Sequence, residues 1–279
     1  MIKTIDIEAI ESRVLYKYLS SAITPRPIAL VSTIDVDGNK NLSPFSFFNV
    51  FSINPPILVF SPVRRVRDNS SKNTLDNLHQ IKECVIALVT EEIAQQVSLT
   101  SSEFAADINE FKKGGFTELK SEKITPSRIK ESPINFECKV NEIINLGEEG
   151  GAGSLVLCEV LRIHIDQNIL DADEMIDPIK LNIVSRLGGS WYGKTTEDSI
   201  YKIAKPISKI GMGFDNLPEE IKKSKFLTGN ELAILASIES IPRKEKFEIR
   251  ENKNLKEKHI LAKEFLSQGK MEDAWQILL

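Results

Sequence analysis

The stretch LSPFSFFNVFSINPPILVFSP at residues 42–62 mixes aromatic rings with prolines and small polar side chains. It holds five of the thirteen Phe residues of the chain, so the aromatic side chains are concentrated here. A membrane span is excluded, because the Pro, Ser and Asn positions would leave backbone groups without hydrogen bonds in lipid. Phe, Val and Ile favour pleated, half-buried strands, and residues 54–56 (Asn-Pro-Pro) favour a turn. The stretch predicts two buried strands, which leave Ser43, Ser46 and Asn49 unexplained.

Similar apolar runs on both sides of this stretch predict further strands. We expect strands at residues 27–34, 45–52, 56–62, 84–90, 134–146 and 154–166. The sequence DVDGNKN after the first of them is typical of a hairpin turn. The first three strands are too close together for parallel crossovers. A mainly β fold follows, a six-stranded Greek-key barrel, because closure removes exposed sheet edges.

Helical patterns are confined to short segments and to the end of the chain. We expect helices at residues 13–19, 72–82 and 91–99. From about residue 210 the sequence is charged and has a helical period, with an apolar stripe in its last helix. We predict a barrel domain at 1–206 and a C-terminal helical extension at 207–279, in which we see no chemistry.

Charge and composition exclude several classes of function. The net charge of −4 and the isoelectric point near 5.6 argue against a nucleic-acid surface. No stretch reaches the ~20 apolar residues of a spanning helix, so no membrane role is expected. The first twelve residues are acidic and lack an apolar run, so we expect a cytoplasmic protein.

The three cysteines are scattered. Cys84, Cys138 and Cys158 each lie in an apolar run, without C-x-x-C spacing or a nearby His. We expect them to be buried as small hydrophobic residues, and we expect no metal site.

Residues 70–78, SSKNTLDNL, combine hydroxyls and a cation at the expected start of a helix. A helix N-terminus offers free N–H groups and the positive end of a dipole, so Ser70, Lys72, Asn73 and Thr74 suit a phosphate. The alternative is a plain helix cap, for which the same residue types are common. Local sequence leaves both open.

Two more segments carry cations beside rigid or hinged backbone. TPRP at 24–27 holds Arg26 between two prolines before a strand, and RLGGSWYG at 186–193 carries Arg186, Trp191 and Tyr192. The Gly-Gly pair would let the second segment fold over a flat ligand, although an ordinary surface loop explains it equally well.

These segments together resemble the flavin reductase-like FMN-binding family, relatives of flavoredoxin. The resemblance begins with SAITPRPIALVSTIDVDGNKNLSPFSFFNVFSINPPILVFSP and continues through KNTLDNL, EFKKGGFTE, SPINFECKV and LVLCEVLRIHID to RLGGSWYG. It covers roughly residues 15–206 in the right order. It implies a split β-barrel that dimerises and holds FMN.

The resemblance also implies where FMN would bind. The Ser-Pro-Phe-Ser segment would run beside the isoalloxazine, which needs an apolar slot with a few hydrogen bonds. The residues that it implies for the ring are Ser43, Pro44, Phe45, Ser46 and Ser61, and those for the phosphate are Arg26, Ser70, Lys72, Asn73 and Thr74. The family usually has Lys-Asp-Thr at 72–74, and this chain has Asn73.

Function follows from the implied cofactor. Hydride would pass from NADH or NADPH to the flavin, so no side chain needs to act as a catalytic acid, base or nucleophile. Arg186, Trp191 and Tyr192 would border the substrate, and His164 would either contact it or be structural. A flavin-dependent monooxygenase or another redox protein would be the partner, and the protein would be a homodimer. The alternatives are a flavoredoxin-like electron or FMN carrier, and a non-catalytic barrel whose tail recruits a partner.

Overall fold

The chain forms two compact units. The computed structural model describes residues 1–203, 210–245, 247 and 253–279. One unit spans Met1–Tyr201 and the other spans Lys202–Leu279. The predicted domain boundary after residue 206 lies outside the described residues.

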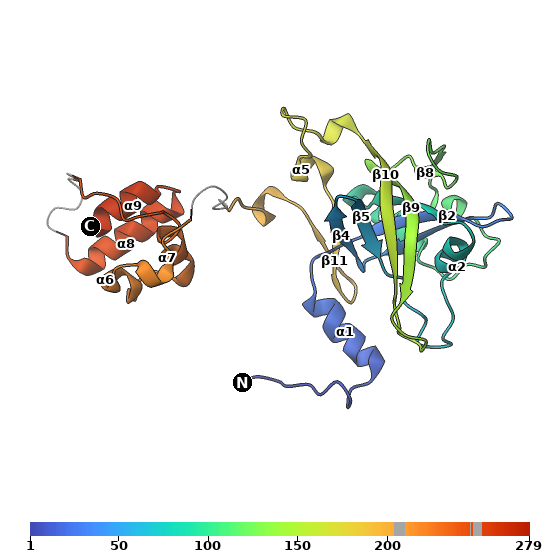
Figure 1. The fold of residues 1–279 in the computed structure, drawn as a ribbon, viewed down its shortest axis with the longest axis horizontal. Helices are drawn as coiled ribbons and strands as arrows, with labels where there is room; N and C mark the ends of the chain where they lie inside the picture. Colours follow the sequence, from blue (N-terminus) through green and yellow to red (C-terminus); the bar gives the residue numbers. More distant parts are fainter. Residues whose placement is uncertain (204–209, 246, 248–252) are drawn as a thin grey trace. The chain divides into compact units, whose positions relative to one another are not determined.

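The first unit is built around an antiparallel sheet, which has seven strands among the described residues (Figure 1). Their order is β3-β2-β6-β9-β10-β5-β4. The strands are β2 (Ala29–Ile34), β3 (Lys40–Phe45), β4 (Phe48–Ile53), β5 (Pro56–Phe60), β6 (Glu83–Leu88), β9 (Ile134–Asn145) and β10 (Ser154–Ile165). The mainly β split-barrel fold with helices at the C-terminus is thereby confirmed.

The central strands are buried on both faces. In β2, Ala29 and Val31 enter one apolar cluster while Leu30 enters another. Successive side chains of a strand point to opposite faces, so both faces of β2 are covered. The same division occurs in β6, where Cys84 and Val85 belong to different clusters. This explains why these strands are continuous apolar runs in the sequence.

Helices cover the two faces. α2 (Asn73–Gln80) packs against β2 and β3 and buries Leu75 and Leu78 in the first cluster. The second cluster includes residues from 3₁₀ helix η1 (Glu91–Ile93), α3 (Ala94–Leu99) and α4 (Glu110–Gly114). The three cysteines are free and buried as predicted, with 3.8 Å between the sulfurs of Cys84 and Cys158.

The sequence prediction of one strand at 45–52 was wrong. The turn at Asp35–Asn39 is the predicted hairpin turn, but the strand that follows it is β3, which ends at Phe45. The chain then bends at Ser46–Phe47 and continues as β4, which pairs with β5 instead of β2. β3 and β4 are the two outer strands of the sheet order, so this bend joins opposite ends of the sheet. The sequence predicted six strands because it did not separate β3 from β4 at this bend.

A smaller sheet accompanies the large one. It contains β1 (Arg26–Pro27), β11 (Val184–Gly188) and β12 (Trp191–Lys194), in the order β1-β11-β12. The segment RLGGSWYG is therefore the turn and two strands of a hairpin, where the sequence suggested a loop. α1 (Ser12–Ala22) contacts β11. The short elements of this unit are β7 (Glu118–Leu119), β8 (Arg128–Ile129), 3₁₀ helix η2 (Gln167–Ile169), α5 (Pro178–Leu181) and 3₁₀ helix η3 (Glu197–Ser199).

The second unit is helical and has its own apolar core. Its helices are α6 (Glu219–Lys222), α7 (Gly229–Leu235), α8 (Leu255–Ser267) and α9 (Met271–Leu278). Trp275 is fully buried, and its indole N–H donates a hydrogen bond of 3.2 Å to the carbonyl of Leu235. Among the described residues no helix is long and apolar enough to cross a membrane.

Candidate functional site

The start of α2 presents an unpaired cation and free backbone donors. Lys72 is the N-cap residue of α2, and no side chain caps the helix. The first N–H groups of a helix lack partners within it. The ammonium of Lys72 is half-buried and has no hydrogen-bond or ion-pair partner among the described residues. Burial lowers the pKa of Lys72, and the nearby Arg65 lowers it further, whereas the charge of Glu103 opposes the shift.

A small hollow adjoins this helix start, which we call the α2 hollow. It has a volume of ≈ 20 Å³, enough for a single polar group and too little for a ring system. Its lining residues are Asn41, Ser43, Arg65, Lys72, Asn73, Thr74, Ser102, Glu103, Phe104 and Glu110. The structure thus brings together Ser43, Lys72, Asn73 and Thr74 of the predicted cofactor residues.

A buried polar chain fixes Thr74. Its hydroxyl donates to Asn41 Oδ1 at 2.6 Å, and Asn41 Nδ2 donates to Glu110 Oε1 at 2.9 Å. The backbone N–H of Leu42 donates to the other oxygen of Glu110 at 3.2 Å. Burial raises the pKa of Glu110, although these hydrogen bonds oppose the shift. The hydroxyl proton of Thr74 is used inside the protein, so its backbone N–H and oxygen lone pairs are what remains for a ligand.

Sequence reasoning missed Asn41 and Glu110. Glu110 lies 69 residues from Asn41 in the chain, and neither belongs to a motif that points to a ligand. Only the contact of α4 with β3 brings them together.

Asn73 and Ser70 serve the loops around α2. The side-chain amide of Asn73 donates a hydrogen bond to the carbonyl of Phe104 at 3.3 Å. An ionised aspartate at this position could not donate this bond. The hydroxyl of Ser70 accepts from Arg65 Nη1 at 2.7 Å and bonds to Asp68, and it does not line the α2 hollow. Arg65 also pairs with Glu103 at 3.0 Å.

A larger cavity lies beside β4 and β5, and we call it the aromatic cavity. It has a volume of ≈ 290 Å³ and mostly apolar walls with a few polar groups, as flat organic ligands require. Its lining residues are Ile23, Pro25, Arg26, Pro27, Ser46, Phe47, Phe48, Asn49, Phe51, Val59, Ser61 and Leu155. Gly153 allows the close approach beside Ser61, because a Cβ there would lie 2.6 Å from the Ser61 hydroxyl.

The segment Ser43–Ser46 connects the two cavities. Ser43 lines the α2 hollow and Ser46 lines the aromatic cavity. Three residues of strand span ~10 Å. Phe45 points into the core, where its ring lies 5.1 Å from that of Phe60, and Pro44 is half-buried opposite Leu30 of β2. A ligand with a polar end and a flat ring system would have a partner at each end of this segment.

Arg26 caps the C-terminal end of α1 with its guanidinium. Its Nη1 donates to the carbonyl oxygens of Ser20 and Ile23, at 2.6 Å for Ile23. Its Nε is buried without a hydrogen-bond partner among the described residues, and its guanidinium lies 5.7 Å from the ring centre of Phe47. Arg26 and Lys72 line different cavities, so the structure does not bring these two predicted phosphate ligands together.

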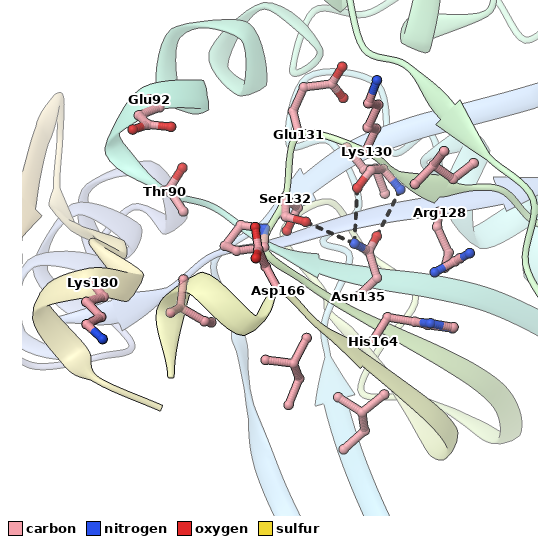
Figure 2. A pocket seen from close by; sticks show the side chains of 16 residues that line it. Thr90, Glu92, Arg128, Lys130, Glu131, Ser132, Asn135, His164, Asp166 and Lys180 are labelled. Atoms are coloured by element: carbon pink, nitrogen blue, oxygen red, sulfur yellow. Dashed lines mark hydrogen bonds between the residues drawn. The ribbon is translucent and has the colours of Figure 1, made fainter. Parts of the chain in front are cut away.

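His164 lies in a third, separate cavity of ≈ 620 Å³ (Figure 2). Its Nε2 is 2.7 Å from Oε1 of Glu137, a fully buried carboxylate. Burial raises the pKa of Glu137, but hydrogen bonds from the backbone of Glu122 and Lys123 and from His164 outweigh it and leave that pKa lowered. His164 therefore holds a buried charge in place, and it shares no cavity with the other predicted site residues.

The β11–β12 hairpin carries the remaining predicted substrate residues. The guanidinium of Arg186 stacks 4.5 Å from the ring centre of Tyr192 and donates to the carbonyl of Gly189 at 2.6 Å. Trp191 is 76% exposed, so its ring is open to a ligand or to another protein surface. Tyr192 also lines a fourth cavity, of ≈ 260 Å³, together with Lys194. Among the described residues no group of three His, Cys, Asp or Glu is placed to hold a metal ion.

Comparison with known proteins places this arrangement in a family. The chain is 36% identical over 189 residues to an uncharacterized protein of Aquifex aeolicus, covering 68% of this chain and 94% of that protein. Its fold matches nitrilotriacetate monooxygenase component B from Bacillus cereus with a TM-score of 0.68 and 27% identity, over 73% of this chain and 99% of that chain. It also matches 2-nitrobenzoate 2-nitroreductase from Pseudomonas fluorescens with a TM-score of 0.65 and 28% identity, over 74% and 98% of the two chains.

The pattern of the flavin reductase like domain matches residues 20–180, which include the α2 hollow, the aromatic cavity and the Ser43–Ser46 segment between them. The sequence resemblance to this family, first drawn from residues 15–206, is therefore confirmed. The chain belongs to the flavin reductase like domain family.

Proposed function

We propose that this protein binds FMN and acts as an NAD(P)H-dependent flavin oxidoreductase. The observation that carries the proposal is the Ser43–Ser46 segment, which joins a cationic helix start to an aromatic cavity. Bound FMN would supply hydride-transfer chemistry between a reduced nicotinamide and an acceptor. The residues of the chain need only bind, orient and exclude water.

We place the phosphate of FMN at the α2 hollow. The ammonium of Lys72 has no partner among the described residues, and the backbone N–H groups of Asn73 and Thr74 lie at the positive end of the α2 dipole. Ser70 would act indirectly, because its hydroxyl accepts a hydrogen bond from Arg65, which lines the hollow. We assign the phosphate to Lys72, Asn73 and Thr74, and we place Arg26 elsewhere.

The isoalloxazine fits the aromatic cavity. Ser46 would present its backbone and hydroxyl groups to the polar edge of the ring, and Ser61 faces the same cavity just after the end of β5. Ser43, which lines the α2 hollow, and Pro44 would lie along the part of FMN that leads to the phosphate. Phe45 supports this segment from the core. The Trp191 and Tyr192 hairpin would border the second substrate. We leave His164 out of the site, because it holds Glu137 in a separate cavity.

We further propose a homodimer that works with another redox protein in the cytoplasm. Phe51 lines the aromatic cavity yet is 70% exposed, as expected of a surface that another subunit covers. Nitrilotriacetate monooxygenase component B is a component of a monooxygenase by its name, which favours a flavin-dependent monooxygenase as the partner. Three buried free thiols are consistent with a reducing compartment.

The visible spectrum of the purified protein tests the proposal. FMN-loaded protein should be yellow, and its flavin absorbance should bleach without oxygen when NADH or NADPH is added. Flavin that binds but stays oxidised with both nicotinamides, and bleaches only with a reduced protein, would replace the reductase by a flavoredoxin-like carrier. Protein that takes up no FMN would contradict both functions.

A further inference from the structure

Three side chains form a cross-strand row in the sheet β1-β11-β12. Arg26 of β1 is the register partner of Arg186 in β11, and Arg186 is the register partner of Tyr192 in β12. Side chains at directly opposed positions lie on the same face of a sheet. The side chains of Arg26 and Arg186 therefore leave the same face of this sheet from neighbouring positions.

This row places two positive charges side by side without a counter-charge. Among the described residues no carboxylate forms an ion pair with Arg26 or Arg186. Burial lowers the pKa of Arg26, and the charge of Arg186 lowers it further, whereas Tyr16 opposes the shift. Like charges directly opposite each other are destabilising in paired strands. Carbonyl oxygens and aromatic rings contact these guanidiniums, but no ion pair among the described residues offsets the repulsion.

The two arginines differ in what they can reach. Arg26 is only 7% exposed and is held by the carbonyl oxygens at the end of α1, so it acts mainly through its charge. Arg186 is half-buried, and its partners are the carbonyl of Gly189 and the ring of Tyr192. Aromatic rings flank both guanidiniums, since Phe47 lies against Arg26. The rings leave the outer edge of a stacked guanidinium available for bidentate hydrogen bonds.

The packing of α1 fixes the row beside the aromatic cavity. Gly188 has φ +98°, and a Cβ there would lie 2.8 Å from the Cα of Ser21, so the hairpin approaches α1 as closely as glycine allows. Arg26 itself lines the aromatic cavity. Arg186, the register partner of Arg26, lines none of the four cavities, so an anionic group held by Arg186 would lie outside the aromatic cavity, on a part of the molecule that extends from it.

We infer that Arg26, Arg186 and Tyr192 form a seat for an anionic group of the second substrate, distinct from the seat of the FMN phosphate at Lys72. This inference rests on the proposed function, because only a flavin oxidoreductase would bind a second substrate beside FMN. Two sources of the anion fit this chemistry: the pyrophosphate of a nicotinamide dinucleotide, and the carboxylate of an aromatic acceptor. Arg186 makes the contact, Arg26 adds positive charge behind it, and Tyr192 holds the guanidinium of Arg186 in position.

Calorimetric titration of FMN-loaded protein with two probes tests the seat. ADP-ribose carries the pyrophosphate without a nicotinamide, and benzoate carries an aromatic carboxylate. We expect one of them to bind, and Arg186→Gln to weaken that binding tenfold to a hundredfold, as expected for a lost charge-assisted hydrogen bond. Arg186→Lys should restore part of the affinity. Lys139→Gln, which removes an exposed cation that lines none of the four cavities, should leave it unchanged.

FMN affinity, followed by the quenching of flavin fluorescence, separates the two proposals. Arg186→Gln should leave it within about twofold of the wild type. A large loss of FMN affinity would assign the arginines to the cofactor and overturn the inference. Two other results would also overturn the inference: neither probe binds to the wild type, or the probe binds equally well to the wild type and to Arg186→Gln. If the flavin fails to bind, the proposed function falls, but titration of the flavin-free protein with the same probes still tests the anion seat.

Discussion

Glu110 is a buried acid at the end of the chain of hydrogen bonds that fixes Thr74. It is 3% exposed, and burial raises its pKa. A group whose pKa is higher in the folded than in the unfolded state stabilises the fold below its unfolded pKa. That contribution is lost as the pH rises through the folded pKa. The neutral carboxyl is therefore the form that favours folding.

We predict that Glu110→Gln, which keeps a neutral side chain of the same shape, changes the pH dependence of stability. As the pH rises from about 4 to 7, the wild type should lose stability relative to the variant. Urea unfolding midpoints at several pH values measure this difference. Glu148→Gln, at an exposed position, is the control and should track the wild type. Parallel pH curves for wild type and Glu110→Gln would show that Glu110 does not titrate in this range.

At the scale of elements, α2 is the helix whose position the sequence predicted best. Residues 72–82 have a helical pattern, and hydroxyls and a lysine stand at its start. The structure has α2 at Asn73–Gln80 with Lys72 as its N-cap. The sequence could not show that the hydroxyl proton of Thr74 is directed inward, because its acceptor Asn41 lies on β3. Local signals specify the helix, and distant contacts decide what its first turn offers to a ligand.

We predict that Lys72→Ala lowers the affinity for FMN by about tenfold or more and the affinity for riboflavin by much less. Only FMN has the phosphate, and a charge-assisted hydrogen bond is worth about 1.5–3 kcal/mol. Fluorescence titration with both flavins measures the two affinities. Lys82→Ala, an exposed lysine just after α2, is the matched control. Equal loss of both flavins in Lys72→Ala would place the phosphate elsewhere.

Element boundaries within the aromatic stretch show where sequence reasoning fails. Residues 45–52 have the composition of one strand, yet the chain bends at Ser46–Phe47 and changes neighbours from β2 to β5. Strand pairing is a long-range property, so composition reveals the strand but not its partner. The sequence likewise suggested a hinge at the Gly-Gly pair at 188–189, whereas Gly188 ends β11 and Gly189 begins the tight turn to β12.

At the scale of the whole molecule, β4 leaves an apolar surface open. Val50, Phe51 and Ile53 are 52%, 70% and 81% exposed, and all three belong to β4, at one end of the sheet order. Contiguous exposed apolar side chains mark interaction surfaces, and a two-fold dimer would bury the same residues from both subunits.

We predict that Phe51→Glu converts a dimer into a monomer and weakens FMN, because a buried charge at the interface would be costly. Light scattering with and without FMN measures the mass. Val36→Glu introduces the same charge at a similarly exposed apolar residue, in the turn after β2, and should remain dimeric. A wild type that is monomeric and still binds FMN at full strength would contradict the proposed dimer.

In the Ser43–Ser46 segment, the number of residues matters for ligand binding as well as their identity. Ser43 and Ser46 face different cavities because the strand ends between them at a fixed residue. Inserting or deleting one residue there would turn each following side chain to the opposite face. Natural variants of this protein should therefore tolerate changes of side chain in this segment more readily than changes of its length. Insertions belong instead in the Asp35–Asn39 turn, where the register of the flanking strands is free to remain the same.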